Sequence, residues 1–276
     1  MMRYIADLHT HSTASDGQYS PEKLVHRAKE RGLEALALTD HDTLGGLDEA
    51  ALAGERLGMR ILRGVELSAK EYRNLHILGY GFVNGPSRLA ELCKDMRGRR
   101  NRRKYEIIDY LKTKGVDIPL AEVEALASGG VAGRPHFARV VVNHGYAASN
   151  REVFDRWLDT DEFQEINDRF KVNAGTCLEA IKNSGGRASL AHPYQLGLEN
   201  DALEELIAHL KEGGLDAIEC YYPRYTAGQT AFYLHMAEKY NLRITGGSDF
   251  HGEKVKPDIQ LAAWELELDW LLDTSQ

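Results

Sequence analysis

A His-x-His pair ends an apolar run near the start of the chain, in the stretch "YIADLHTHSTASDG". Side chains two positions apart on an extended strand point to the same face, because strand side chains alternate with a period of two. His9 and His11 are therefore spaced to bind one metal ion, and Asp16 adds a carboxylate five residues after the second histidine. A motif this short also occurs as two ordinary surface histidines, so metal binding requires further ligands from elsewhere in the chain.

Other side chains of metal-binding type stand where predicted strands end or begin. They are His41, Glu66, His76, His192, Asp249 and His251. With the first motif they make nine ligands, whereas zinc binds about four and manganese or iron up to about six. The pattern predicts two or three ions that share carboxylates, and a set of imidazoles and carboxylates without thiolate suits zinc, manganese or iron. Histidines buried for packing are the alternative, but these would not gather at strand ends.

The chain alternates strands and helices over its first 80 and last 90 residues. Seven strands are predicted, at residues 3–9, 33–42, 60–69, 75–83, 186–193, 215–222 and 242–251. After the first strand, Ser20 is placed to cap a helix, Pro21 to begin it and Gly32 to end it. Repeated βα units predict a parallel sheet or an α/β barrel, whose active site lies at the carboxyl ends of the strands.

Residues 84–186 interrupt this alternation, because they contain no such strand. Helices are predicted there at residues 87–115, 119–127, 134–145, 150–160 and 175–186. A helical block inside a βα series is most simply an insertion over one end of the barrel. We therefore divide the chain into a metal-binding barrel, residues 1–83 and 187–276, and an inserted helical subdomain for substrate binding, residues 84–186.

The composition is that of a soluble globular protein with one large core, since 43% of the 276 residues are hydrophobic and 28% are charged. A net charge of −8 argues against a protein coated for non-specific binding of nucleic acid. No apolar run reaches 18 residues and no signal peptide is recognisable, which predicts a cytoplasmic protein without a membrane span. Cys93, Cys177 and Cys220 are scattered, as expected of reduced thiols in a core.

At the level of motifs, "DLHTHSTASDG", "LTDHDT", "GVELS", "HILGY", "AHP" and "GGSDFHG" resemble, in order, those of PHP (polymerase and histidinol phosphatase) domain phosphoesterases. The resemblance covers both halves of the chain. It implies a distorted (β/α)7 barrel, the PHP fold, with a site for two or three metal ions. Asp16 in "SDG" and the helical insertion are most similar to the branch that includes nucleoside 3′,5′-bisphosphate phosphatases and 5′-to-3′ exoribonucleases.

The resemblance also implies how the ligands are shared. The implied sets are His9, His11, Glu66 and Asp249 for one ion, Asp16, His41 and His251 for a second, and Glu66, His76 and His192 for a third. We expect Asp16, His192 and Asp249 to act in catalysis. Asp40 and Asp42 are expected to orient imidazoles rather than to bind metal. His76 does not follow a predicted strand, so its assignment depends on the resemblance alone.

Metal ions suit the hydrolysis of phosphate esters, because two ions about 4 Å apart can bring the pKa of a bridging water near neutrality and neutralise the leaving oxygen. The insertion offers a second anion site in "RGRRNRRK", residues 97–104, and in "GRPHFAR". A basic run is commonly a solvated helix face. Here arginine can hold phosphate with two hydrogen bonds, and Pro135 at a helix start leaves backbone N–H groups free. The expected contacts are Arg99, Arg102, Arg103, Arg134 and His136.

These features predict a phosphoesterase that uses two or three divalent ions, manganese in the first place and zinc or iron as alternatives. The expected substrates are nucleoside 3′,5′-bisphosphates, which lose the 3′-phosphate, or short 5′-phosphorylated oligoribonucleotides. A histidinol phosphatase is an alternative, although its substrate has one phosphate and a cationic amine and needs no arginine cluster. Two further alternatives are a non-catalytic PHP module stabilised by metal and a metal-dependent amide hydrolase. No membrane contact or obligate protein partner is evident in the sequence.

Overall fold

The computed structural model describes residues 3–83, 85–127 and 132–272, and its eight strands form one sheet in the order β7-β6-β5-β4-β3-β2-β1-β8. The strands are β1 Arg3–Thr10, β2 Ala35–Leu38, β3 Arg60–Ser68, β4 His76–Tyr80, β5 Arg187–Leu190, β6 Ala217–Tyr221, β7 Arg243–Gly246 and β8 Trp264–Glu267. Beyond β7, Phe250 pairs with Thr10 of β1, so the sheet curls into a nearly closed barrel. The predicted α/β barrel is confirmed, with β8 as a strand that the sequence pattern did not reveal.

Two strands run against the others. β1, β2 and β3 are parallel, as are β5, β6 and β7, whereas β4 is antiparallel to both of its neighbours and β8 is antiparallel to β1. His76, the first residue of β4, therefore pairs with Ser68, the last residue of β3. The start of β4 lies at the rim where the parallel strands end, which explains why His76 opens its strand.

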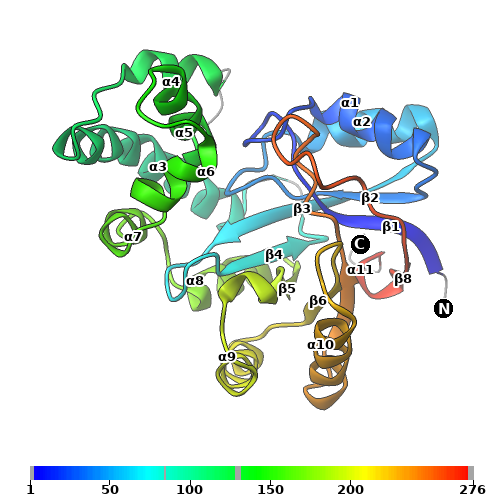
Figure 1. Ribbon diagram of the computed structural model, residues 1–276. Coiled ribbons are helices and arrows are strands. Elements are labelled where there is room, and N and C mark those ends of the chain that lie inside the picture. The colour runs from blue at the N-terminus through cyan, green and yellow to red at the C-terminus, as the bar shows by residue number, and fades with distance from the viewer. Residues whose placement is uncertain (1–2, 84, 128–131, 273–276) are drawn as a thin grey trace. The chain divides into compact units, whose positions relative to one another are not determined.

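Several helices lie wholly within the barrel unit, and the last of them contributes Leu271 to the buried cluster that contains Ala6 and Leu8 of β1. They are α1 Pro21–Glu30, α2 Leu47–Leu57, α8 Ala174–Asn183, the 3₁₀ helix η2 Pro193–Leu196, α9 Asn200–Glu212, α10 Ala227–Lys239 and α11 Asp269–Leu272. Figure 1 shows α1 and α2 side by side above the strands β1 and β2. The predicted start of α1 is confirmed, because the Ser20 hydroxyl accepts a hydrogen bond from the Lys23 amide at 3.3 Å and Pro21 is the first helical residue.

The barrel interior is apolar below the rim. All four residues of β2 are buried, as expected of a strand covered on both faces.

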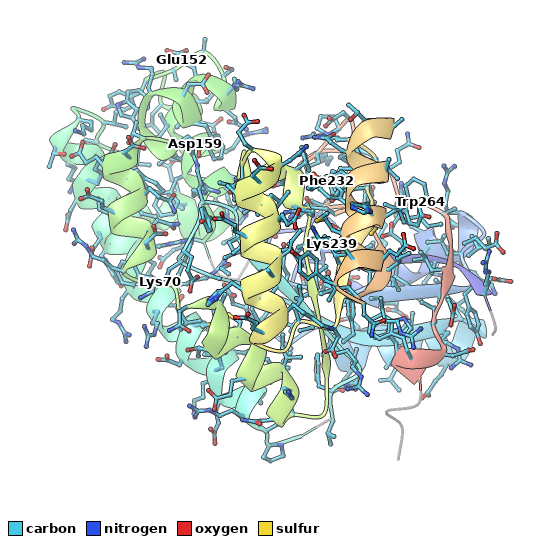
Figure 2. All side chains as sticks on the ribbon, turned by 90° about the horizontal axis from the view of Figure 1, so that it is seen from below. Lys70, Glu152, Asp159, Phe232, Lys239 and Trp264 are labelled. Atoms are coloured by element: carbon cyan, nitrogen blue, oxygen red, sulfur yellow. The ribbon has the colours of Figure 1, made fainter. Side chains whose placement is uncertain are left out.

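On the outside, Lys239 at the end of α10, labelled in Figure 2, forms an ion pair with Glu204 of α9. Trp264 of β8, labelled in Figure 2, stacks on Tyr221 of β6 with 5.5 Å between the ring centroids. β8 is at one end of the strand order and β6 is next to the other end, so this contact helps to close the barrel.

The chain divides into two compact units, one made of residues 1–93 and 173–276 and the other of residues 94–172. The second unit contains most of α3 Arg88–Thr113, with α4 Leu120–Leu126, α5 Arg134–Asn143, α6 Asn150–Val153, the π-helix η1 Phe154–Leu158 and α7 Asp161–Asp168. It has its own buried cluster, which includes Phe137, Trp157 and Phe163. α7 was not predicted. The predicted domain limits at residues 1, 84 and 276 lie outside the described residues, and the predicted division remains a prediction.

Cys93, Cys177 and Cys220 are buried thiols. Burial raises the pKa of the Cys177 thiol well above its usual value. Among the described residues, no helix is both long enough and apolar enough to cross a membrane.

Candidate metal centre

The nine predicted ligands meet at one rim of the barrel. Those from the carboxyl ends of β1, β2, β3, β5 and β7 are joined there by His76 from the start of the reversed strand β4. His9, His11 and Glu66 have fully buried side chains. Asp16, His41 and His76 are 15%, 13% and 16% exposed, so the centre opens to solvent on the side of these three residues.

A first group consists of His9, His11, Glu66 and Asp249, whose ligand atoms all lie within 4.8 Å of one another. Nε2 of His11 is 3.2 Å from Oε2 of Glu66 and 3.3 Å from Oδ1 of Asp249. Nε2 of His9 is 3.3 Å and 3.7 Å from the same two oxygens. Ligands at about 2.0–2.1 Å from a tetrahedral ion are separated by about 3.3 Å, so this group has the spacing of a first coordination sphere.

A second group consists of His11, Asp16, His41 and His251. Oδ1 of Asp16 is 3.4 Å from Nε2 of His251, and Oδ2 of Asp16 is 4.0 Å from Nε2 of His41. The three residues expected to hold a second ion therefore lie together. His11 borders both this group and the first, which places the two groups next to each other.

A third group surrounds Glu66. Its Oε1 atom is 2.6 Å from Nδ1 of His76 and 3.0 Å from Nε2 of His192, and these two nitrogens are 3.3 Å apart. Nδ1 of His41 is 3.0 Å from the other oxygen, Oε2, and His41, Glu66 and His76 also form a group with the spacing of metal ligands. Glu66 thus turns its two oxygens to different sets of imidazoles, as a carboxylate shared between ions does.

The residues present fit a metal centre by a test that is independent of spacing. Among the described side chains, several buried polar atoms of the rim have no hydrogen-bond partner, namely Nε2 of His9, both ring nitrogens of His11, Nδ1 of His41, Oε2 of Glu66 and Nδ1 of His192. Buried polar groups are almost always hydrogen-bonded, and leaving one unsatisfied costs about 1–3 kcal/mol. These residues therefore fit a metal centre, because bound cations would satisfy the unpartnered atoms at His9, His11, His41 and Glu66.

The pKa values of the rim residues are shifted by their charged neighbours as well as by burial. Burial lowers the pKa of His11, but the neighbouring Asp249 and Glu66 carboxylates outweigh burial and raise it to about 9. Burial raises the pKa of Glu66, but His41 and His76 hold it well below its usual value. Likewise, Lys256 and His251 outweigh burial at Asp249 and keep its pKa well below the usual value. The carboxylates are therefore ionised and ready to bind cations.

Asp40 and Asp42 accept hydrogen bonds from the segments next to the ligands. Oδ1 of Asp40 accepts hydrogen bonds from the Ser12 amide at 2.8 Å and the Ser15 hydroxyl at 2.6 Å. Asp42 accepts a hydrogen bond from the Ser68 amide at 2.8 Å. These hydrogen bonds fix the backbone next to His11 and at the end of β3, and the expected role of both carboxylates in orienting imidazoles remains a prediction.

The basic residues predicted to bind substrate lie in the unit of residues 94–172 and differ in their surroundings. Arg99 is on the surface of α3, where its Nε atom is 2.8 Å from Oδ2 of Asp95, and Arg102 is exposed. Arg103 is buried, and its Nη1 atom donates a hydrogen bond to Oδ1 of Asn167 at 2.6 Å. The run of basic residues therefore divides between an exposed face and the interior of the unit.

Arg134 and His136 lie in the first turn of α5. Nη1 of Arg134 donates a hydrogen bond to Oδ1 of Asp159 at 2.9 Å, and Nδ1 of His136 accepts one from the Gly133 amide at 3.0 Å. Lys171 belongs to the same surroundings, although the sequence did not single it out. Its pKa is lowered by burial, and also by the charges of Arg134 and Arg103. Arg103, Arg134 and Lys171 therefore influence one another electrostatically, with Asp159 paired to Arg134 and Asp168 paired to Lys171.

Comparison with models of protein families shows to which family this chain belongs. A model described as the PHP domain matches residues 7–160, which is more than half of the chain. The chain belongs to the PHP domain family. The family membership predicted from the motifs is confirmed.

Curated relatives of this PHP protein span nearly its whole length. A 5′-3′ exoribonuclease of Haemophilus influenzae is 35% identical over 89% of each chain. A phosphoribosyl 1,2-cyclic phosphate 1,2-diphosphodiesterase of Eggerthella lenta is 34% identical over 90% of this chain and 95% of its own. A 3′,5′-nucleoside bisphosphate phosphatase of Chromobacterium violaceum is 31% identical over 89% and 86%. The predicted class of metal-dependent phosphoesterase is confirmed.

The fold of the PHP protein also has a solved counterpart. A structure from Chromobacterium violaceum, described as an amidohydrolase with bound sulfate and no metal, superposes with a TM-score of 0.82. It is 29% identical and covers 95% of this chain and 92% of its own. The likeness confirms the barrel fold with its additions.

Other residues of this PHP centre were missed by sequence reasoning. Glu219 of β6 accepts hydrogen bonds at both oxygens, one from Nδ1 of His9 at 3.1 Å and one from the His192 amide at 2.7 Å. A carboxylate within the apolar strand "AIECY" was the available signal, because a buried charge requires partners. Tyr222 and Lys256 both contact Asp249, at 3.1 Å and 2.6 Å, and the local sequence gave no signal for either.

Proposed function

We propose that this protein hydrolyses phosphate esters of nucleotides. The preferred substrates are nucleoside 3′,5′-bisphosphates, from which the 3′-phosphate is released, and short 5′-phosphorylated oligoribonucleotides. The observation that carries the proposal is the gathering of nine imidazole and carboxylate side chains at one rim, in three groups with the spacing of metal ligands. The names of the Haemophilus and Chromobacterium relatives support the choice of substrate.

The centre suits two or three divalent ions. We propose Mn²⁺, with Zn²⁺ and Fe²⁺ as alternatives, because imidazole and carboxylate ligands without thiolate suit all three. When bound, such ions activate a water for attack on phosphorus and neutralise charge on the phosphoryl group. The nine residues at the rim would hold them, and Glu66 would be shared, because its two oxygens face different imidazoles.

The exposed side of the centre is where substrate would enter. Asp16, His41 and His76 are the partly exposed ligands, whereas His9, His11 and Glu66 are closed off from solvent. Asp16 would therefore meet the scissile phosphate from the open side. His192 and Asp249, which lie deeper, are also proposed to act on the reacting groups, and Glu219 keeps the His192 backbone in place.

A second phosphate of the substrate would bind the basic residues of the other unit. Arg134 is the strongest candidate, because it is partly exposed and Asp159 holds its guanidinium at 2.9 Å, whereas Arg103 is buried against Asn167 and is proposed as a contact beside it. His136 stands in the first turn of α5, where backbone N–H groups favour anions. Arg99 is partly exposed and Arg102 is exposed, and both would add longer-range attraction.

Phosphate release by the Mn²⁺-loaded protein tests the proposal. The substrates compared are a nucleoside 3′,5′-bisphosphate, the matching nucleoside 3′-monophosphate, a short 5′-phosphorylated oligoribonucleotide, phosphoribosyl 1,2-cyclic phosphate and histidinol phosphate. Losing a charged contact costs about 1.5–3 kcal/mol, so the bisphosphate should exceed the monophosphate in kcat/KM by about 10- to 100-fold. Equal rates on these two would remove the second-phosphate site. Preference for the cyclic phosphate would move the function toward that of the Eggerthella relative.

The expected partner is the nucleotide or oligonucleotide substrate alone. A cytoplasmic location remains a prediction from the sequence.

A further inference from the structure

The loop that follows β7 is held against the loop that follows β1. The Gln18 amide donates a hydrogen bond to the His251 carbonyl at 2.7 Å, and the Lys254 amide donates one to Oε1 of Gln18 at 2.8 Å. Gly252 has a φ of +95°, and a Cβ there would overlap the side chain of Gln18, so only glycine permits this approach. The turn from Gly252 to Lys256 is closed by a hydrogen bond from the Lys256 amide to the Gly252 carbonyl at 2.9 Å.

This turn directs Lys256 at one particular oxygen of the metal centre. Nζ of Lys256 is 2.6 Å from Oδ2 of Asp249, and the Tyr222 hydroxyl donates a hydrogen bond to the same oxygen at 3.1 Å. Oδ1 of Asp249 faces the other way and lies 3.3 Å from Nε2 of His11. The carboxylate is therefore divided, with one oxygen among the ligands and the other held by two donors.

Two features describe the surroundings of the Asp249 carboxylate. Asp249 has a φ of +57°, a conformation that an aspartate adopts only when its surroundings hold it. Its side chain is 3% exposed, so water does not solvate Oδ2 in place of the two donors. The Lys256 side chain, in contrast, is 30% exposed.

We propose that Lys256 and Tyr222 are positioning residues that hold Asp249 so that it offers a single oxygen to the metal ion. Lys256 supplies a full charge at Oδ2, and Tyr222 fixes the plane of the carboxylate. Without these two donors, the Asp249 carboxylate could rotate so that Oδ2 also binds the ion. The negative charge on Oδ2 would then no longer be compensated by the Lys256 ammonium. The inference rests on the proposed function only in taking the bound cation to be a divalent metal ion.

The test measures binding of Mn²⁺ alone by calorimetric titration, so it needs no substrate. The variants are Lys256→Met, Lys256→Arg and Tyr222→Phe, and Lys254→Met, in the same turn and exposed, is the matched control. Loss of a residue that orients a metal ligand costs about 10- to 100-fold in affinity, which is expected for Lys256→Met. A neutral hydrogen bond contributes about 1 kcal/mol, so Tyr222→Phe should lose about fivefold. Lys256→Arg should retain most of the affinity, and Lys254→Met all of it.

Activity on the best nucleotide substrate then separates positioning from substrate contact. A positioning role predicts that Lys256→Met lowers kcat, and that added Mn²⁺ restores part of it. If Mn²⁺ affinity is unchanged while KM rises, Lys256 contacts substrate and the proposal is wrong. The proposal also fails if Lys256→Arg loses as much affinity as Lys256→Met, with thermal melting used to confirm that both are folded. Mn²⁺ binding without turnover of any substrate would contradict the proposed function and leave the role of Lys256 standing.

Discussion

At the scale of single residues, three rim positions adopt a backbone conformation that side chains rarely occupy. Asp42, His192 and Asp249 have φ values of 52°, 25° and 57°. Each such residue costs about 1–3 kcal/mol and persists only where its surroundings hold it. The His192 amide donates to Oε2 of Glu219 at 2.7 Å, and the Asp249 amide donates to the His9 carbonyl at 2.8 Å. The directions of the ligands are therefore fixed by hydrogen bonds behind them.

Glu219 is the residue whose change tests this support most directly. In Glu219→Gln the amide oxygen can still accept one hydrogen bond, but the amide nitrogen cannot accept the second, so either His9 or His192 loses its partner. We expect Mn²⁺ affinity or kcat to fall by about 10- to 100-fold, measured by titration and by phosphate release.

The control for Glu219→Gln is Glu204→Gln, which breaks a surface ion pair with Lys239. It should change neither quantity, because exposed ion pairs contribute about 0–1 kcal/mol. Full activity in Glu219→Gln would mean that the rim needs no support from β6.

At the scale of elements, the loop after β7 has to pass very close to β1. A Cβ on Gly247 would overlap Cβ of His9 and lie 2.7 Å from the His9 backbone nitrogen. Gly247→Ala must therefore push the two segments apart, at a cost of about 1–3 kcal/mol. We expect a lower melting temperature together with weaker Mn²⁺ binding, because His9 and Asp249 lie on either side of the contact.

A matched variant separates this clash from a general effect of replacing glycine. Gly228, near the start of α10, has open space around its Cβ position, with only Oγ1 of Thr226 at 4.0 Å. Gly228→Ala should be neutral or stabilise by about 0.4–1 kcal/mol, since alanine restricts the unfolded chain. Equal melting temperatures for the two variants would show that β1 and the loop are not tightly packed.

The helix α5 carries the prediction for substrate binding. Arg134→Ala removes a guanidinium that Asp159 holds at 2.9 Å, and it leaves the rim of the barrel unchanged. If Arg134 binds the second phosphate, KM for the bisphosphate rises by about 10- to 100-fold while kcat and Mn²⁺ content stay as in the unaltered protein. Steady-state kinetics and metal analysis measure the two effects.

Arg151→Ala, in the same unit, is the control for Arg134→Ala. Arg151 is exposed and pairs with Asp155 one helical turn away, so its loss should leave KM unchanged. If Arg134→Ala has no larger effect on KM than Arg151→Ala, the second-phosphate site does not involve α5.

The strands of the barrel also explain which site residues could be predicted from the sequence and which could not. Strand ends were readable because apolar runs stop at a ligand, which is why His9, His41, His192 and His251 could be placed at one rim. The role of His76 could not be derived, because its position depends on β4 running backwards, and strand direction is set by pairing between distant segments. Glu219 was missed for a related reason, since its partners lie 210 and 27 residues away. The carboxylate within "AIECY" indicated a buried charge, but contacts this distant leave no local pattern that identifies the partners.

At the scale of the whole molecule, the barrel brings together charges that the chain would otherwise keep apart. Three carboxylates and six imidazoles meet at one rim, several with no hydrogen-bond partner for a buried atom. Without cations these groups compensate one another only in part. The metal centre is therefore expected to contribute to folding stability as well as to catalysis, because an ion that binds only the folded chain stabilises it.

Removal of the metal tests this expectation on the intact protein. At a free ion concentration of about 100 times Kd the stabilisation is about 2.7 kcal/mol, and each kcal/mol shifts Tm by about 2–4 °C in a protein of this size class. Chelation should therefore lower Tm by about 5–10 °C and abolish turnover, and added Mn²⁺ should restore both. Glu66→Gln, which removes the carboxylate shared by the first and third groups, should gain less in Tm from Mn²⁺ than the unaltered protein, whereas Glu204→Gln should respond as the unaltered protein does. If a chelator leaves Tm and turnover untouched, the rim does not hold catalytic metal ions.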